Sequence, residues 1–275
     1  MTKILQKKYK FLSDYLKSLE SVVVAFSGGV DSSLLLKVCK DVLKDKVLAV
    51  IGVSETYPKR ETNFALKMCK ELEVKYLTIN TKELNNLNFK NNPENRCYFC
   101  KTELFSKLQE IAKKEKFKYV LDGANYSDLQ DFRPGSIAAQ EQKVVSPLKE
   151  AKLTKEEIRQ ISKKLKLPTW NKPSFACLSS RFPYNTEISL ENLKKLEQAE
   201  DYLYSLGFNQ FRVRYHQDLV RIEVDKNEIK KFLNESFTKR IVAKFKKIGF
   251  TYITLDLQGY RTGSMNEKMF KKNWR

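Results

Sequence analysis

The sequence predicts an α/β protein, in which a parallel sheet with helices on both faces is followed by a smaller C-terminal α+β domain. Over most of the chain, short apolar segments alternate with segments of helical spacing, a pattern typical of a parallel sheet covered on both faces. After a loop with three prolines at 168–186, the order changes to helix, strand, strand, helix and strand. We therefore expect two domains, residues 1–185 and residues 186–275.

The strands of the first domain are predicted from their apolar runs. Residues 21–26 (SVVVAF) are continuous and β-branched, as expected of a strand that is buried on both faces. Further strands are expected at 47–54, 75–79, 119–122 and 144–145, with helices at 32–43, 60–72, 102–114 and 155–165, the last capped by Thr154. Because ligands collect at the carboxyl ends of parallel strands, the loops that follow these strands should face one crevice.

The second domain shows a different pattern. An amphipathic helix at 190–206 precedes a predicted hairpin, 211–215 and 219–224, in which apolar and polar residues alternate. A long helix at 227–248 and a strand at 251–257 complete the expected order. We interpret this part of the chain as a substrate-binding and oligomerisation domain.

Composition limits the classes of protein to consider. Hydrophobic residues make up 41% of the 275 residues, which indicates a globular chain. Its apolar runs are too short to cross a bilayer, and residues 1–19 lack the apolar core of a signal peptide, so we expect a cytoplasmic protein. The formal net charge of +19 favours anionic partners, although lysines spread over solvated helix faces would give the same value.

The strongest motif is SGGVDSS at 27–33, directly after the first predicted strand. Its two glycines allow a tight turn whose N–H groups can approach an anion, and the helix that follows presents its positive end there. It lacks the lysine of a Walker loop and resembles the PP-loop signature SGGxDSS of Rossmann-like ATP pyrophosphatases; a plain turn with capping serines is the alternative. The PP-loop family uses this loop to bind the pyrophosphate that leaves ATP, with magnesium on its aspartate, here Asp31. The nucleotide-binding residues are then Ser27, Gly28, Gly29, Asp31, Ser32 and Ser33.

Three of the five cysteines lie in predicted loops or at a helix start. Cys97 and Cys100 form a CxxC pair, and Cys177 lies before the second domain. Three thiolates suit a [4Fe–4S] cluster with one open iron, whereas structural zinc normally takes four ligands; a redox pair with Cys177 idle is the alternative. Cys39 and Cys69 lie in predicted helices among apolar residues and should be buried.

Several motifs together resemble the LarE family of sulfur transferases over nearly the whole chain. The matching segments are SGGVDSS at 27–33, NNPxxRCxxCK at 91–101, GAN at 123–125, DFRPG at 131–135, ACLSSRFPY at 176–184, RVRYH at 212–216, GF at 249–250, DL at 256–257 and GYRTGSM at 259–265. One departure is Asn185, where the family usually has glycine. Asparagine tolerates positive φ better than most residues, so we expect the turn to persist.

The resemblance implies a specific reaction. LarE proteins use ATP to insert sulfur into pyridinium-3,5-biscarboxylic acid mononucleotide, for the nickel-pincer nucleotide of lactate racemase. One kind sacrifices the sulfur of a single cysteine, matching Cys177, and another has the CxxC pair as well and holds a [4Fe–4S] cluster. Cys97 and Cys100 indicate the second kind, and the family also implies a homo-hexamer.

Four further residues are candidates for substrate binding. Arg212 and Arg214 alternate along one predicted strand, so their side chains point to the same face and could bind a phosphate. The alternative is that both arginines belong to an exposed polar face of the hairpin. The family resemblance favours phosphate binding. Ser180 and Arg181 adjoin Cys177 and could hold phosphate or pyrophosphate near the sulfur donor.

For three polar residues, the sequence leaves two interpretations open. Asp128 and Asp131 lie in the loop after the fourth strand, where a metal or ribose contact and simple loop capping look identical in sequence. His216, the only histidine, either orients a neighbour or lies at the surface.

Other classes of PP-loop protein remain as alternatives. A tRNA thiolase would share the adenylation step and the cysteines, and the net charge would suit RNA, but the chain shows no recognisable RNA-binding module, so nucleic acid is not the expected partner. A synthetase that forms C–N bonds would not need the cysteines. A nucleotide-binding module without activity would not split ATP into AMP and pyrophosphate.

Overall fold

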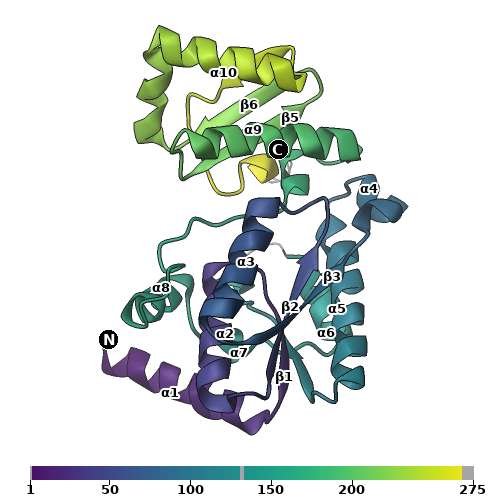
Figure 1. Cartoon of the computed structure of the whole chain (residues 1–275), viewed down its shortest axis with the longest axis vertical. Coiled ribbons are helices and arrows are strands. Elements are labelled where there is room, and N and C mark those ends of the chain that lie inside the picture. The colour runs from purple at the N-terminus through teal and green to yellow at the C-terminus, as the bar shows by residue number, and fades with distance from the viewer. Residues whose placement is uncertain (1, 131–132, 268–275) are drawn as a thin grey trace, which may run out of the picture. The chain divides into compact units, whose positions relative to one another are not determined.

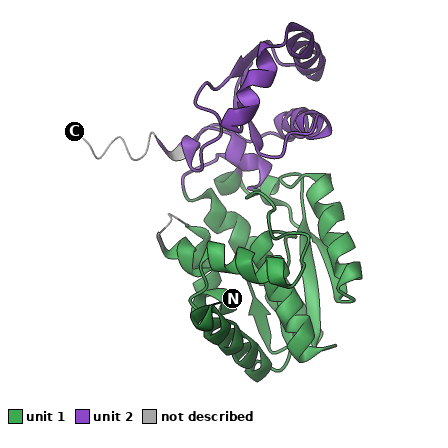
Figure 2. Ribbon diagram, turned by 90° about the vertical axis from the view of Figure 1, so that its left-hand side faces the viewer, with its two compact units in different colours: residues 1–89, 95–175 green, residues 90–94, 176–275 purple. Residues whose placement is uncertain are grey.

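The computed structural model describes residues 2–130 and 133–267 and divides into two compact units (Figure 2). Unit 1 comprises residues 1–89 and 95–175, and unit 2 comprises residues 90–94 and 176–275. The sequence placed the boundary after residue 185, whereas this division falls after Phe175. Unit 2 therefore includes the loop that carries Cys177.

Unit 1 contains a four-stranded parallel sheet in the order β3-β2-β1-β4, which confirms the predicted α/β class. Its strands are β1 (Val22–Ala25), β2 (Val47–Val53), β3 (Lys75–Asn80) and β4 (Tyr119–Leu121). The strand expected at 144–145 is reduced to a single bridge between Val145 and Leu121.

Helices cover both faces of this sheet (Figure 1). Val22 and Val24 point into one core, which they share with α1, α2, α3, α7 and α8, while Val23 points into the other, beside α5. This alternation follows from the period of two along a strand, and it explains why the strand residues are apolar without interruption. The helices are α1 (Lys3–Ser18), α2 (Val30–Leu43), α3 (Lys59–Glu71), α4 (Leu87–Lys90), α5 (Arg96–Lys114), α6 (Gly135–Glu141), α7 (Pro147–Glu150) and α8 (Lys155–Lys164), with 3₁₀ turns η1 (Glu83–Asn85) and η2 (Tyr126–Gln130).

Two helix starts bear on the predicted site. Thr154 caps α8 as expected, in a capping box with Glu157. Helix α5 begins at Arg96, earlier than the predicted start at 102, so both cysteines of the CxxC pair lie inside its first turns. Among the described helices, none is long and apolar enough to span a membrane.

Unit 2 is built around a three-stranded sheet in the order β5-β6-β7. The predicted hairpin is confirmed, since β5 (Phe211–His216) pairs antiparallel with β6 (Leu219–Val224); β7 (Tyr252–Leu255) then pairs parallel with β6. The other elements are α9 (Leu190–Ser205), α10 (Glu235–Ile248), and the 3₁₀ segments η3 (Leu178–Arg181), η4 (Lys226–Leu233) and η5 (Ser264–Asn266).

The single long helix predicted at 227–248 is wrong. Asn234 has an extended backbone and separates η4 from α10. Its side chain accepts a hydrogen bond of 2.9 Å from the N–H of Phe237, so it caps α10. The apolar spacing continues through both segments, and only the capping tendency of asparagine signals the break.

Residues 90–94 belong to unit 2 because they run beside residues 182–188. The side-chain amide of Asn92 donates to the carbonyl of Pro183 at 2.6 Å. The N–H of Asn185 donates to the carbonyl of Asn92 at 2.9 Å, and the N–H of Ile188 to that of Lys90 at 2.8 Å. Part of the Asn-rich loop therefore belongs to unit 2, with Asn92 buried there.

Asn185 adopts the left-handed conformation expected of it, with φ of 62°. We expect Asn185→Val to lower the free energy of unfolding by about 1–2 kcal/mol, because a β-branched side chain is strained in this region. Asn185→Gly keeps the backbone hydrogen bond and relieves the strain, so it serves as the matched control. Denaturant unfolding compares the two, and equal stability of both variants would contradict the expectation.

Candidate functional site

The glycine turn follows β1 and leads directly into α2. Gly28 has φ of 68°, and a Cβ added to it would lie 3.2 Å from Cβ of Ala65 and 3.3 Å from the ring of Phe64. Both the backbone conformation and the close approach of α3 therefore require glycine at this position. The predicted strand, turn and helix are all present around the motif.

Hydrogen bonds within the turn involve Ser32. Its hydroxyl donates to the carbonyl of Gly29 at 3.3 Å and lies 3.1 Å from the hydroxyl of Ser27. The Ser33 hydroxyl is buried and has no hydrogen-bond partner among the described residues. Helix α2 begins at Val30 without a side-chain cap. The first-turn N–H groups of a helix have no partners in that helix, and its positive end favours an anion at this turn.

Asp31 lies in the first turn of α2, where both of its carboxylate oxygens have partners. The side-chain amide of Asn125 is 3.4 Å from Oδ1, and the ammonium group of Lys155 forms an ion pair with Oδ2. A carboxylate beside an anion-binding turn fits the oxygen ligands that Mg²⁺ prefers. The sequence did not identify Lys155, because residue 155 comes from the distant start of α8 and carries no motif.

Asp128 acts as a capping residue in this structure. Its carboxylate accepts from the N–H of Asn125 at 3.0 Å and pairs with Arg133 at 2.8 Å. Burial raises the pKa of Asp128, although these two partners oppose the shift. Asp131, the other candidate in this loop, lies outside the described residues.

The CxxC pair places two thiols on one face of α5. Cys97 and Cys100 are three residues apart, a spacing that brings helix side chains together. Cys97 is exposed and Cys100 is half-buried, with its thiol 3.6 Å from Oε1 of Glu83. Glu83 is buried, and burial raises its pKa.

Two of the remaining cysteines are buried, as predicted. Cys39 and Cys69 are buried in the core of unit 1, and burial raises the pKa of both thiols, to about 12 for Cys69. Cys177 belongs to unit 2, whereas the CxxC pair belongs to unit 1. Within the described part of either unit, no group of three or more histidine, cysteine, aspartate or glutamate side chains has a metal-binding arrangement.

In unit 2, the loop around Cys177 is held by Arg181. The guanidinium of Arg181 is fully buried, and its Nη1 donates to the carbonyls of Ala176 at 2.8 Å and Cys177 at 3.1 Å. The same nitrogen donates to the hydroxyl of Ser180 at 2.8 Å. These contacts fix the backbone of the loop while the Cys177 thiol stays half-buried.

Glu200 on α9 is the partner of Arg181. Its two carboxylate oxygens accept from Nε at 2.8 Å and from Nη2 at 2.9 Å, and neither side chain is exposed. Glu200 also accepts from the backbone N–H of Val213 at 3.1 Å, which links the loop to β5. Burial would raise the pKa of Glu200, but the charge and hydrogen bonds of Arg181 outweigh it, so its pKa lies below that of an ordinary glutamate.

Arg212 and Arg214 are each only 5% exposed, so they do not form the exposed polar face that the sequence left open. Arg214 donates to Glu223 at 2.9 Å and to the carbonyl of Ser180 at 3.1 Å. Arg212 lies over the ring of Tyr260, 5.0 Å from its centroid. Burial and the nearby charge of Arg181 lower the pKa of Arg212 to about 10, which leaves it protonated at neutral pH.

The buried charges of unit 2 differ in number. Among its described residues, three guanidinium groups are buried, those of Arg181, Arg212 and Arg214, and two carboxylates, those of Glu200 and Glu223. An anion would balance the excess positive charge. Sequence reasoning found the arginines but missed both glutamates, because neither belongs to a motif.

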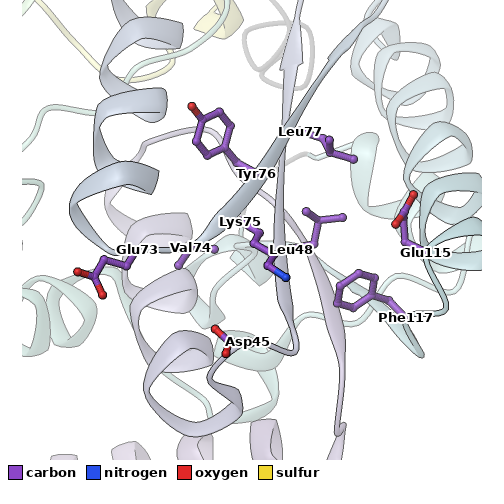
Figure 3. Close-up of a pocket in the computed structure, with 9 residues that line it drawn as sticks. All are labelled: Asp45, Leu48, Glu73, Val74, Lys75, Tyr76, Leu77, Glu115 and Phe117. Atoms are coloured by element: carbon purple, nitrogen blue, oxygen red, sulfur yellow. The ribbon is translucent and has the colours of Figure 1, made fainter.

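A cavity of about 740 Å³ lies elsewhere in unit 1, among the residues shown in Figure 3. Its lining includes Leu48 near the start of β2 and Lys75 at the start of β3. It is thus at the amino ends of the strands, whereas the glycine turn follows the carboxyl end of β1. The cavity does not belong to the predicted site.

Comparisons with known proteins agree with these motifs. Residues 4–116, which contain the glycine turn, match the family model described as NAD synthase. NH(3)-dependent NAD(+) synthetases of Campylobacter jejuni are 32% identical over only 84 residues, 30% of this chain and 34% of theirs.

Other relatives match along nearly the whole length. A protein of Synechocystis sp. is 43% identical over 98% of this chain and 100% of its own. The pyridinium-3,5-bisthiocarboxylic acid mononucleotide synthase of Lactiplantibacillus plantarum is 40% identical over 93% of this chain and 92% of its own. The chain therefore belongs to the family of pyridinium-3,5-bisthiocarboxylic acid mononucleotide synthases, the LarE family that its motifs resemble.

Proposed function

We propose that this protein is an ATP-dependent sulfur transferase acting on pyridinium-3,5-biscarboxylic acid mononucleotide. A substrate carboxylate attacks the α-phosphorus of ATP and pyrophosphate leaves; a sulfur nucleophile then attacks the acyl-adenylate, AMP leaves, and a thiocarboxylate remains. The observation that carries this proposal is the SGGVDSS turn at the start of α2, in a chain that is 40% identical to a synthase of this kind over 93% of its length.

Adenylation makes modest chemical demands. A carboxylate is already anionic and needs no general base, so the protein must mainly align two anions and neutralise their charge. We assign pyrophosphate binding to Ser27, Gly28, Gly29, Ser32 and Ser33, and a bound Mg²⁺ to Asp31. The metal would supply positive charge to the leaving pyrophosphate.

The phosphate of the substrate nucleotide is assigned to the positive interior of unit 2. Arg212 and Arg214 come from one strand and carry the charge that the two glutamates leave unbalanced. Ser180 and Arg181 were expected to bind phosphate as well. Because the guanidinium of Arg181 is fully buried on Glu200 and the loop carbonyls, we propose that Arg181 mainly positions the Cys177 loop.

The sulfur is proposed to come from a sulfide on a [4Fe–4S] cluster held by Cys97, Cys100 and Cys177. The donor set fits, since two thiols share one face of α5 and three thiolates leave one iron open. The alternative donor is the sulfur of Cys177 itself.

Anaerobic purification tests this assignment. We expect about four irons and matching labile sulfide per chain in the wild type, lost in Cys97→Ser and Cys100→Ser because the cluster then lacks a ligand. Cys69→Ala, which removes a core thiol, is the matched control and should keep its iron.

A wild type without iron and labile sulfide would overturn the cluster. Mass spectrometry after turnover would then show Cys177 lighter by the loss of its sulfur, as dehydroalanine.

Alternatives of other classes are not favoured. NAD synthetases match only part of the chain, so a C–N synthetase accounts for the ATP-binding region and leaves unit 2 unexplained. A tRNA thiolase does not account for the full-length similarity to the nucleotide synthase. We further propose a cytoplasmic homo-oligomer, a hexamer by family resemblance, that supplies the cofactor of lactate racemase.

A further inference from the structure

Lys172 lies in the loop after α8 and contacts the glycine turn from outside. Its ammonium group donates to the carbonyl of Gly28 at 3.0 Å and pairs with Glu61 at 2.7 Å. It also lies 3.8 Å from the centroid of the Phe64 ring. All of these residues belong to unit 1, and Lys172 is part of no motif discussed above.

These contacts determine how one peptide of the turn is oriented. In a trans peptide, the carbonyl of one residue and the N–H of the next point in opposite directions. With the Gly28 carbonyl held toward Lys172, the N–H of Gly29 must point away from Lys172. The carbonyl of Gly29 is itself hydrogen-bonded to the hydroxyl of Ser32 and the N–H of Ser33. Both glycine carbonyls, which would repel an anion, thus already have partners.

The position of Lys172 is itself fixed. Arg159 on α8 donates to the carbonyls of Trp170 and Lys172, each at 2.8 Å, which holds the backbone of this loop. The ammonium group has three donors, enough for the Gly28 carbonyl and the Glu61 carboxylate together. Because Glu61 already neutralises it, the arrangement suits a group that shapes the turn better than one that binds phosphate.

We propose that Lys172 is a positioning residue of the pyrophosphate-binding turn, which orients the Gly28–Gly29 peptide so that the N–H of Gly29 faces the anion. This inference rests on the proposed function, in which the turn binds pyrophosphate. It adds a residue from a distant loop to the motif residues to which we assign pyrophosphate binding.

Calorimetric titration of the full chain with magnesium pyrophosphate and with ATP tests the proposal. Lys172→Met should weaken pyrophosphate binding about 10-fold, the lower end for a lost hydrogen bond to a charged group. Lys172→Gln should stay within about 3-fold, since its amide can donate to the carbonyl. The control is Lys163→Met, which removes the same charge from a lysine over the ring of Trp170 and should bind as the wild type does.

Three results would overturn the inference. The first is Lys172→Met binding pyrophosphate within about 2-fold of the wild type. The second is equal weakening in Lys172→Met and Lys172→Gln, which would indicate an effect of charge alone. The third comes from Glu61→Gln and does not depend on whether Lys172→Met folds. If freeing Lys172 tightened pyrophosphate binding about 10-fold, Lys172 would be a direct phosphate ligand.

Gly29→Val separates this inference from the proposed function. A Cβ at Gly29 meets only the Ser27 hydroxyl, at 3.4 Å, so the variant should fold while its side chain obstructs the anion. If Gly29→Val binds pyrophosphate normally, the turn is not the site and the proposed function fails. If Gly29→Val loses binding and Lys172→Met keeps it, the role of Lys172 alone is wrong.

Discussion

Replacing Cys177 by serine should abolish sulfur transfer while the release of pyrophosphate from ATP continues. Cys177 is both the proposed third cluster ligand and the alternative sulfur donor, so either mechanism stops without its thiol. We expect product formation to fall at least about 1,000-fold, since removal of a nucleophile typically costs this much or more. Serine preserves the loop, because Arg181 and the N–H of Ser180 bind the carbonyl of residue 177 and not its side chain.

The two half-reactions are measured separately. Pyrophosphate release in the presence of substrate reports adenylation, and mass spectrometry of the nucleotide reports the thiocarboxylate. Cys69→Ala is the control, because it removes a core thiol and should leave both steps intact. A Cys177→Ser variant that forms thiocarboxylate at the wild-type rate would exclude Cys177 from the chemistry altogether.

The sequence predicted the sheet of unit 1 well because each of its strands is a local signal. Val22 to Val24 are apolar in succession, and both faces of β1 are buried. Helix boundaries were less predictable. The long helix expected after β6 contains no proline or glycine, yet Asn234 caps a new helix in its middle. The apolar spacing continues across Asn234, so the start of the second helix is marked only by this capping hydrogen bond.

In the candidate site too, features that depend on a local motif could be predicted from the sequence, and contacts between distant residues could not. The glycine turn is one short motif, and its conformation follows from Gly28. The Lys172 contact joins residues 144 positions apart, and Glu200 meets Arg181 from another helix, so neither could be found without the fold. Arg181 illustrates what is missed when the partner of a residue is distant in the sequence. Its neighbour Cys177 suggested a phosphate ligand, whereas its buried partner Glu200 supports the role in positioning the loop that we propose.

Glu200→Ala should have the largest effect on stability. At neutral pH the depressed pKa keeps Glu200 ionised, so its removal leaves the buried charge of Arg181 without this carboxylate and takes away the attraction that Glu200 exerts on the charge of Arg212. Breaking a buried ion pair by deleting one partner typically costs about 3–5 kcal/mol. The Val213 N–H also loses its acceptor, which loosens the contact between α9 and β5.

Hydrogen exchange of the β5 and β6 amides measures this loss in unit 2 without interference from unit 1. Glu191→Ala on the same helix is the matched control, because it removes an exposed ion pair with Lys195 and should leave stability nearly unchanged. A Glu200→Ala variant as stable as the control would mean that other groups or water neutralise the buried arginines. The excess positive charge proposed to bind the substrate phosphate would then already be neutralised in the free protein, and Arg212 and Arg214 would lose the electrostatic argument for that role.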